Sequence, residues 1–127
     1  MRVGDIYVWE TDQAKGHELR RKFHIYIGEA GWREEGHAFL FISSNDYGGD
    51  FEIFQSEYSF LTKEKSYISC NGIVVYPFGG LSNYSPVKVG RLLSEDAAAL
   101  HSTLAGSDTM VSWQIRLCCT AIAALIS

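Results

Sequence analysis

Apolar and polar residues alternate over short stretches in the first 92 positions, and this period of two predicts β-strands. We expect strands at residues 6–10, 23–29, 37–43, 51–54, 66–75 and 88–92. Turn-forming residues separate them, as in the glycine- and aspartate-rich run at 45–50 and the Asn-Gly pair at 71–72. Short strands at such spacing predict a small, strongly bent antiparallel sheet or barrel.

After residue 93 the pattern changes to that of helices. We expect Ser94 to cap a first helix, with Glu95 and Asp96 in its first turn and Gly106 ending it. A second helix is expected to begin near residue 107 or 108. The chain is thus interpreted as one domain of residues 1–127, with a mainly β part at about 1–92 and C-terminal helices at 93–127.

The second expected helix is apolar on much of its circumference. Two stripes run along it, Met110, Trp113, Leu117, Ala121, Ala124 and Val111, Ile115, Cys118, Ile122, Leu125. Such a helix needs cover on two sides, and the chain's own sheet supplies only one of them. We therefore expect a second copy of the chain on the other side, which makes a homodimer.

Composition narrows the function classes. A formal net charge of −4 argues against indiscriminate nucleic-acid binding, although it allows a local basic groove on an acidic body. Three cysteines without a CxxC pair indicate a reducing, cytoplasmic location and no zinc site. We expect no signal peptide, and the apolar run at 117–126 is about half the length of a membrane helix. No metal, other cofactor or membrane partner is expected.

The first candidate for chemistry is a charged loop leading into the second strand, formed by His17, Glu18, Arg20, Arg21 and Lys22. Arginine and lysine bind phosphate oxygens and stabilise the extra negative charge of a pentacovalent transition state. Histidine or glutamate there could transfer a proton. The alternative is a solvated hairpin rim, which is what mixed-charge loops usually are.

Two further candidates follow buried strands. Ser43 and Ser44 end an apolar run, where hydroxyls can donate to a phosphate or align a ribose hydroxyl, or only form a turn. Cys70 could be a nucleophile with a histidine. We favour the alternative that it is a buried core residue, because no positive charge in that strand would lower its pKa.

Taken in order, several segments resemble the MazF/PemK (Kid) family of toxin ribonucleases. Val-Gly-Asp-Ile-Tyr-Val at residues 3–8 resembles the family's first strand, and Lys-Gly-His-Glu at 15–18 resembles its loop. Leu-Phe-Ile-Ser-Ser at 40–44 resembles the strand ending in P-[ICV]-[TS]-[ST]. The segments at 65–71 and 89–96 resemble S-[YV]-V-R-x-D-Q and the closing motif before the helix. The likeness is collinear over nearly the whole chain.

The resemblance implies an SH3-like antiparallel barrel, a homodimer, and a toxin of a type II toxin–antitoxin pair with a cognate antitoxin protein. The implied activity is sequence-selective, metal-independent cleavage of single-stranded RNA through attack by the ribose 2′-hydroxyl. Position by position, the family's catalytic arginine falls at Lys22, with Arg21 beside it, and its threonine or serine falls at Ser43. His17 and Glu18 match residues of the RNA site, and we assign Arg20 and Ser44 to RNA binding with them.

The chain also departs from the family pattern. The family's acid–base arginine and aspartate fall at Ser69 and Asn71, neither of which transfers protons in their place. A second hypothesis is therefore a catalytically degenerate module of the same fold that binds RNA or a protein partner.

Overall fold

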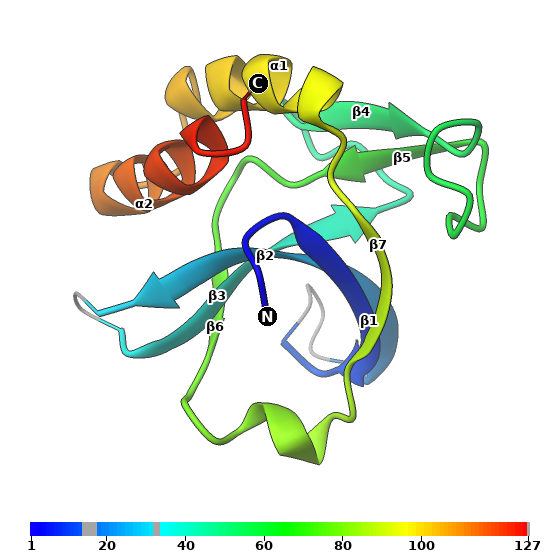
Figure 1. Cartoon of the computed structure of the whole chain (residues 1–127), viewed down its shortest axis with the longest axis vertical. Helices are drawn as coiled ribbons and strands as arrows, with labels where there is room; N and C mark the ends of the chain where they lie inside the picture. The colour runs from blue at the N-terminus through cyan, green and yellow to red at the C-terminus, as the bar shows by residue number, and fades with distance from the viewer. Residues whose placement is uncertain (14–17, 32–33, 127) are drawn as a thin grey trace.

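Antiparallel strands form one strongly curled sheet, and two helices follow it in the chain and cover one of its faces (Figure 1). The computed structural model describes residues 1–13, 18–31 and 34–126. Within these ranges the strands are β1 (Asp5–Thr11), β2 (Arg20–Ala30), β3 (Gly36–Ser43), β4 (Phe51–Phe54), β5 (Lys65–Ile68), β6 (Val74–Tyr76) and β7 (Val87–Arg91). The helices are η1 (Leu81–Asn83), α1 (Ser94–Ala105) and α2 (Ser112–Ala123). The prediction of a mainly β chain with C-terminal helices is confirmed.

The sheet has the order β4-β5-β3-β2-β1-β7, and β6 pairs with the same edge of β3 as β5 does. The single strand predicted at 66–75 is therefore wrong, because residues 69–73 interrupt it. Side chains take the backbone groups there: Asp50 accepts the Cys70 N–H at 3.0 Å, and Ser107 donates to the Cys70 carbonyl at 2.7 Å. Gln114 accepts the Ile73 N–H at 3.2 Å. These side-chain bonds satisfy backbone N–H and C=O groups that strand pairing would otherwise have to satisfy.

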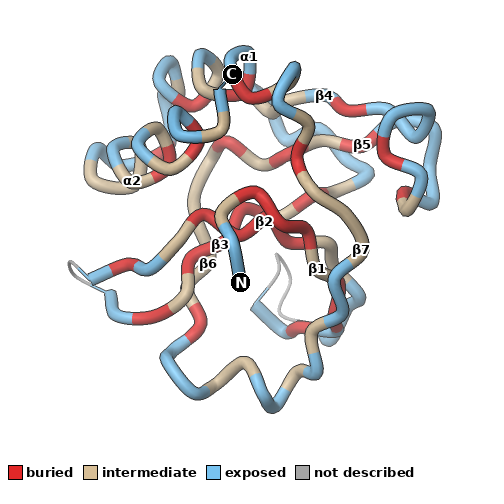
Figure 2. The backbone as a smooth tube through the Cα atoms, in the orientation of Figure 1, coloured by how far each residue is buried: buried red, intermediate tan, exposed pale blue. Residues whose placement is uncertain are grey.

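The face of the sheet under the helices holds the main hydrophobic core. Its largest fully buried side chains come from the inner strands and from both helices: Ile6, Ile25, Leu40, Ile68, Leu100, Leu104 and Ile122. Buried residues in Figure 2 accordingly gather along β1, β2 and β3 and on the inner sides of the helices. Alternation along each strand sends the intervening side chains to the opposite face.

That opposite face carries a second core, which we call the aromatic cluster: Trp9, Tyr26, Phe39 and Tyr76, with the buried His24 among them. The imidazole of His24 stacks on the Trp9 indole at 3.5 Å between ring centroids and 9° between planes. Its Nδ1 donates to the Lys22 carbonyl at 2.9 Å, which leaves Nε2 to accept the Tyr76 hydroxyl at 3.0 Å. Every polar atom of the ring is thus bonded in its neutral form.

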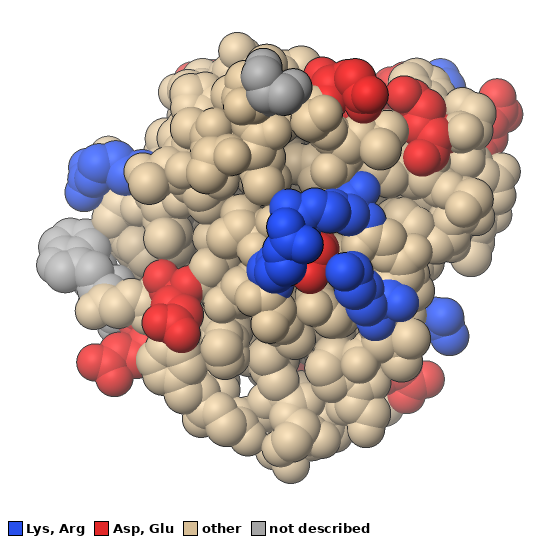
Figure 3. Space-filling model, viewed as in Figure 1, with Lys and Arg blue, Asp and Glu red and all other residues tan. Residues whose placement is uncertain are grey.

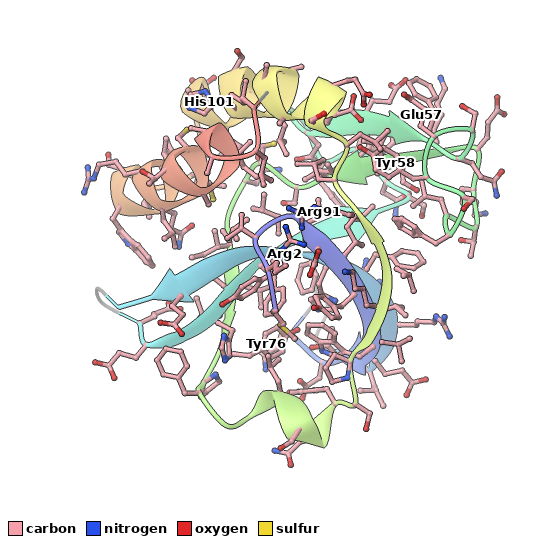
Figure 4. All side chains as sticks on the ribbon, viewed as in Figure 1. Arg2, Glu57, Tyr58, Tyr76, Arg91 and His101 are labelled. Atoms are coloured by element: carbon pink, nitrogen blue, oxygen red, sulfur yellow. The ribbon has the colours of Figure 1, made fainter. Side chains whose placement is uncertain are left out.

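Two predicted helix boundaries are wrong. α1 begins at Ser94, with Leu93 in the capping position and no side-chain cap. The Tyr58 hydroxyl accepts the N–H of Leu93 itself at 3.1 Å and donates to the first-turn Asp96, which fixes the start of the helix. In Figure 4 Tyr58 lies beneath the start of α1.

α2 begins at Ser112 rather than at 107 or 108, because the Ser107 side chain stabilises a turn over residues 107–110. Its hydroxyl oxygen accepts the Met110 N–H at 3.1 Å while it donates to the Cys70 carbonyl. Gly106 does end α1, as predicted.

The two apolar stripes of α2 are covered unequally. Met110, Cys118 and Ile122 are buried, whereas Trp113, Leu117 and Leu125 are half-buried and Val111 is 52% exposed. Trp113 and Leu117 line an open groove beside Ala30 and Gly31. The sheet and α1 therefore cover only part of the helix, and Leu117 borders the open groove.

A buried carboxylate surrounded by cations joins the first and last strands. Asp5 is 3% exposed, and its Oδ1 lies 2.7 Å from Arg91 Nη1 and 3.4 Å from Lys88 Nζ. Burial opposes the charged form, but the bonds from Arg91, the Arg2 N–H and Lys88 together hold the pKa of Asp5 below its ordinary value. Figure 3 shows cations around a central acid, and Figure 4 places Arg2 and Arg91 side by side there.

The stability of the protein is expected to depend on the protonation of His24. Burial lowers the pKa of His24 to about 3, and the charge of Lys22 acts in the same direction. The unfolded chain, with a histidine pKa near 6.5, binds the proton first, so stability is complete above about pH 6.5 and falls as the pH drops toward 3. The loss attributable to His24 between pH 7 and pH 4 is roughly 3 kcal/mol.

Urea unfolding at pH 7 and at pH 4 measures the loss of stability that is due to His24. Carboxylates also titrate in this range, so the comparison is with His24→Gln, which keeps a donor and an acceptor but does not titrate. The wild type should lose roughly 3 kcal/mol more than the variant between the two pH values. Equal losses in both proteins would contradict the prediction, because they would mean that His24 takes up its proton between pH 7 and pH 4 as readily in the folded chain as in the unfolded chain.

Candidate functional site

The cations at the start of β2 belong to the strand itself, so alternation separates them. Arg20 and Lys22 project from one face of the sheet and Arg21 from the other. On the Lys22 side lies a pocket of about 300 Å³, which we call the basic pocket. Its lining is Arg20, Lys22, Phe41, Ser43, Tyr47, Asp50, Ser69 and Asn71.

Strand pairing brings these residues together. β2 and β3 are antiparallel with Phe23 opposite Ile42, so Lys22 and Ser43 come next to one another at the same end of the two strands. On the far edge of β3, Ser43 lies opposite Tyr67 of β5, and the chain runs on from there into Ser69. The ends of β2, β3 and β5 thus meet at one side of the sheet, next to the aromatic cluster.

Asp50 organises the other wall of the basic pocket. One carboxylate oxygen accepts the Cys70 N–H and the Asn71 amide, both at 3.0 Å, and the other accepts the Tyr47 N–H at 3.0 Å. A carboxylate has about four lone-pair sites, so one remains for a ligand or a proton. Asp50 was not among the sequence candidates because it ends a glycine turn, where aspartate is ordinary.

Ser43 and Lys22 are both available to an anion in the pocket. The Ser43 oxygen accepts the Asn45 N–H at 3.1 Å, which leaves its hydroxyl hydrogen to donate. Within residues 1–13, 18–31 and 34–126, Lys22 forms no ion pair, whereas Arg20 pairs with Glu18 at 3.3 Å. The basic pocket thus has an ammonium and a hydroxyl in its lining, which are the groups that bind a phosphate.

The remaining predicted residues lie elsewhere. Arg21 lines a separate hollow with Glu10 and Ser85, on the other face of β2. Glu18 and Ser44 are exposed and do not line the basic pocket, although Glu18 reaches it indirectly through Arg20. His17 lies outside the described residues.

Cys70 is next to the basic pocket but does not open into it. It is 1% exposed, and burial, aided by the charge of Asp50, raises the pKa of its thiol to about 12. His24 is in the aromatic cluster and His37 contacts Tyr26 at 3.2 Å, so neither lines the basic pocket. These positions support the interpretation of Cys70 as a core residue.

No group of three or more His, Cys, Asp or Glu side chains in the described part of the chain could hold a metal ion. No helix there is long and apolar enough to span a membrane. No protein-family model matches the chain, and no curated protein matches it.

Thiol reactivity is expected to follow this burial. Cys70 and Cys118 are buried with pKa values raised to about 12, whereas Cys119 is half-buried. A chromogenic disulfide reagent at pH 8 should react with at most one thiol of the native protein, and Cys119→Ser should abolish that reaction. Denaturant should expose all three thiols. Fast native labelling of Cys70, located by peptide mass spectrometry, would contradict its placement in the core.

Proposed function

We propose that the protein is an endoribonuclease that cleaves single-stranded RNA without a metal ion and with some sequence selectivity. The observation that carries the proposal is the basic pocket, in which Lys22, Arg20 and Ser43 converge from the ends of β2 and β3. A cation and a hydroxyl on one phosphate suit phosphoryl transfer, whose transition state gains negative charge.

In the proposed reaction the scissile phosphate binds to Lys22, with Arg20 beside it and the Ser43 hydroxyl donating to a phosphate oxygen. The ribose 2′-oxygen attacks the phosphorus as its proton passes to the open lone pair of Asp50. The bond to the 5′-oxygen breaks, and that oxygen takes a proton from water. The products are a 2′,3′-cyclic phosphate and a 5′-hydroxyl end.

The resemblance to MazF/PemK toxins and the geometry support each other at four positions. Lys22, Ser43, Ser69 and Asn71 are the places where the family's catalytic residues fall, and all four line the same pocket. On this basis we propose an SH3-like PemK fold, a cytoplasmic toxin and a cognate antitoxin. Arg21, which projects from the opposite face, has no part in the proposed mechanism.

A second candidate is an RNA-binding module that does not cleave. Ser69 and Asn71 supply no acid or base, and three of the lone-pair sites of Asp50 are already occupied. Such a protein would bind RNA in the same pocket and release it intact, so a binding measurement beside the cleavage assay separates the two candidates.

The cleavage experiment compares neighbouring cations on opposite faces of one strand. Purified protein is incubated with a long mixed-sequence RNA in EDTA. Lys22→Ala should slow cleavage by about two orders of magnitude, as does loss of one charge-stabilising group in other enzymes. Arg21→Ala should cleave at nearly the wild-type rate. Arg21 is exposed and Lys22 is half-buried, so stability should shift by less than about 0.5 kcal/mol in Arg21→Ala and by about 1 kcal/mol at most in Lys22→Ala.

Three outcomes would redirect the assignment. If Arg21→Ala loses cleavage while Lys22→Ala still cleaves at the wild-type rate, the site lies on the face of β2 from which Arg21 projects. Binding without cleavage by the wild type would favour the module. If the wild type neither binds nor cleaves RNA, both candidates fail.

We also propose that the protein is a homodimer through the groove that Leu117 of α2 lines beside Ala30 and Gly31. The wild type should sediment as a dimer at micromolar concentration. Leu117→Lys provides the test, because Leu117 is half-buried at this groove, and lysine places a charge there while keeping a high helix propensity. The variant should be a folded monomer. A monomeric wild type would refute the proposal.

A further inference from the structure

A second hollow adjoins the basic pocket and shares two of its walls. It measures about 510 Å³ and is lined by Tyr47, Gly48, Gly49, Asn71, Ser102, Thr103, Gly106, Ser107, Asp108 and Thr109. Because most of these residues belong to the end of α1 and the linker to α2, we call it the linker pocket. Tyr47 and Asn71 line both pockets, so the two are neighbours, and together we call them the groove.

The two halves of the groove differ in charge. The basic pocket holds Arg20 and Lys22, whereas the linker pocket has no lysine or arginine in its lining and one carboxylate, Asp108. It also receives the C-terminal end of α1, where the helix dipole places partial negative charge. A phosphate is favoured in the basic pocket, and a group that donates hydrogen bonds is favoured in the linker pocket.

The wall between the pockets is held in place on both sides. The Asn71 side chain donates to Asp50 at 3.0 Å and accepts the Thr109 hydroxyl at 2.6 Å, so it connects the basic pocket to the linker. The Tyr47 backbone is fixed by Asp50, while its side chain is 47% exposed at the boundary. An aromatic ring beside a phosphate-binding pocket is suited to stacking a base.

Two consecutive glycines line one edge of the linker pocket. Gly48 and Gly49 have φ values of +96° and +74°, and a Cβ atom at either position would meet nothing within 4 Å. Side-chain-free backbone with left-handed geometry leaves this edge of the pocket open to a planar group the size of a base.

We propose that the linker pocket is a nucleobase subsite that selects a base with an exocyclic amino group over uracil. Asp108 accepts hydrogen bonds from the amino group of adenine, cytosine or guanine, and Tyr47 stacks on the base. Uracil offers Asp108 only its N3–H, which two carbonyl oxygens flank and which a carboxylate therefore approaches less favourably, so uracil is bound less well. This inference rests on the proposed function, because it places a neighbouring base of the same RNA whose phosphate occupies the basic pocket.

Binding of labelled octanucleotides, made cleavage-resistant by fluorine at the 2′ position, tests the subsite. Fluorescence anisotropy would compare oligo-A, oligo-C and oligo-U. The wild type should bind oligo-A and oligo-C about tenfold more tightly than oligo-U. Asp108→Asn, whose amide both donates and accepts, should remove most of this difference. The control is Glu95→Gln, the same charge change on an exposed residue at the opposite end of α1, which should keep it.

Lys22→Ala separates failure of the subsite from failure of the proposed function. That variant should weaken all three oligonucleotides by a similar factor, because it removes a phosphate contact. If it does so while the wild type shows no preference, or Asp108→Asn retains the preference, the subsite is refuted and RNA binding stands. If the wild type binds none of the oligonucleotides, the proposed function and the subsite are both refuted.

Discussion

Side-chain alternation along β2 is the constraint on which both the core and the candidate site depend. One face of the strand contributes Ile25 to the core beneath the helices, and the other contributes His24 to the aromatic cluster. Continuing the same alternation toward the strand's start places Lys22 and Arg20 beside the cluster, where both line the basic pocket. A register slip of one residue would exchange Lys22 for Arg21 and expose the core face, so register and site geometry are set together.

Asp50 connects the sheet to the helical part of the chain. It takes the backbone N–H of Cys70 and the side chain of Asn71, and Ser107 and Thr109 approach the same two residues from the linker. The segment between β5 and β6 is therefore an ordered junction, in which the Cys70 backbone and the Asn71 side chain are hydrogen-bonded. Because this junction also forms the wall of the groove, rigidity of the fold and preorganisation of the proposed RNA site come from the same hydrogen bonds.

Local pattern was enough to predict most strands and the existence of both helices, since period and turn residues act over a few positions. The errors occur where a distant residue supplies a bond: Tyr58 accepts the Leu93 N–H before α1, and the Cys70 carbonyl holds Ser107 in a turn before α2. The site was predicted in part. Ser43 and Lys22 were both named, but choosing Lys22 over Arg21 required knowing that β2 extends back to Arg20, and Asp50 has no local signal that distinguishes it from a turn residue.

An acidic protein with a small basic pocket suits a selective RNA enzyme better than a general RNA binder. With a net charge of −4, most of the surface repels a polyanion, so binding depends on the few phosphates that Lys22 and Arg20 can reach. Counterion release from so few phosphate contacts supplies little binding affinity. In the proposed complex the rest of the affinity has to come from contacts with the RNA bases. The polar linker pocket beside the exposed ring of Tyr47 is where the structure offers such contacts. If the protein acts as proposed, weak electrostatic attraction makes base recognition necessary for RNA binding, and this requirement would make cleavage sequence-selective.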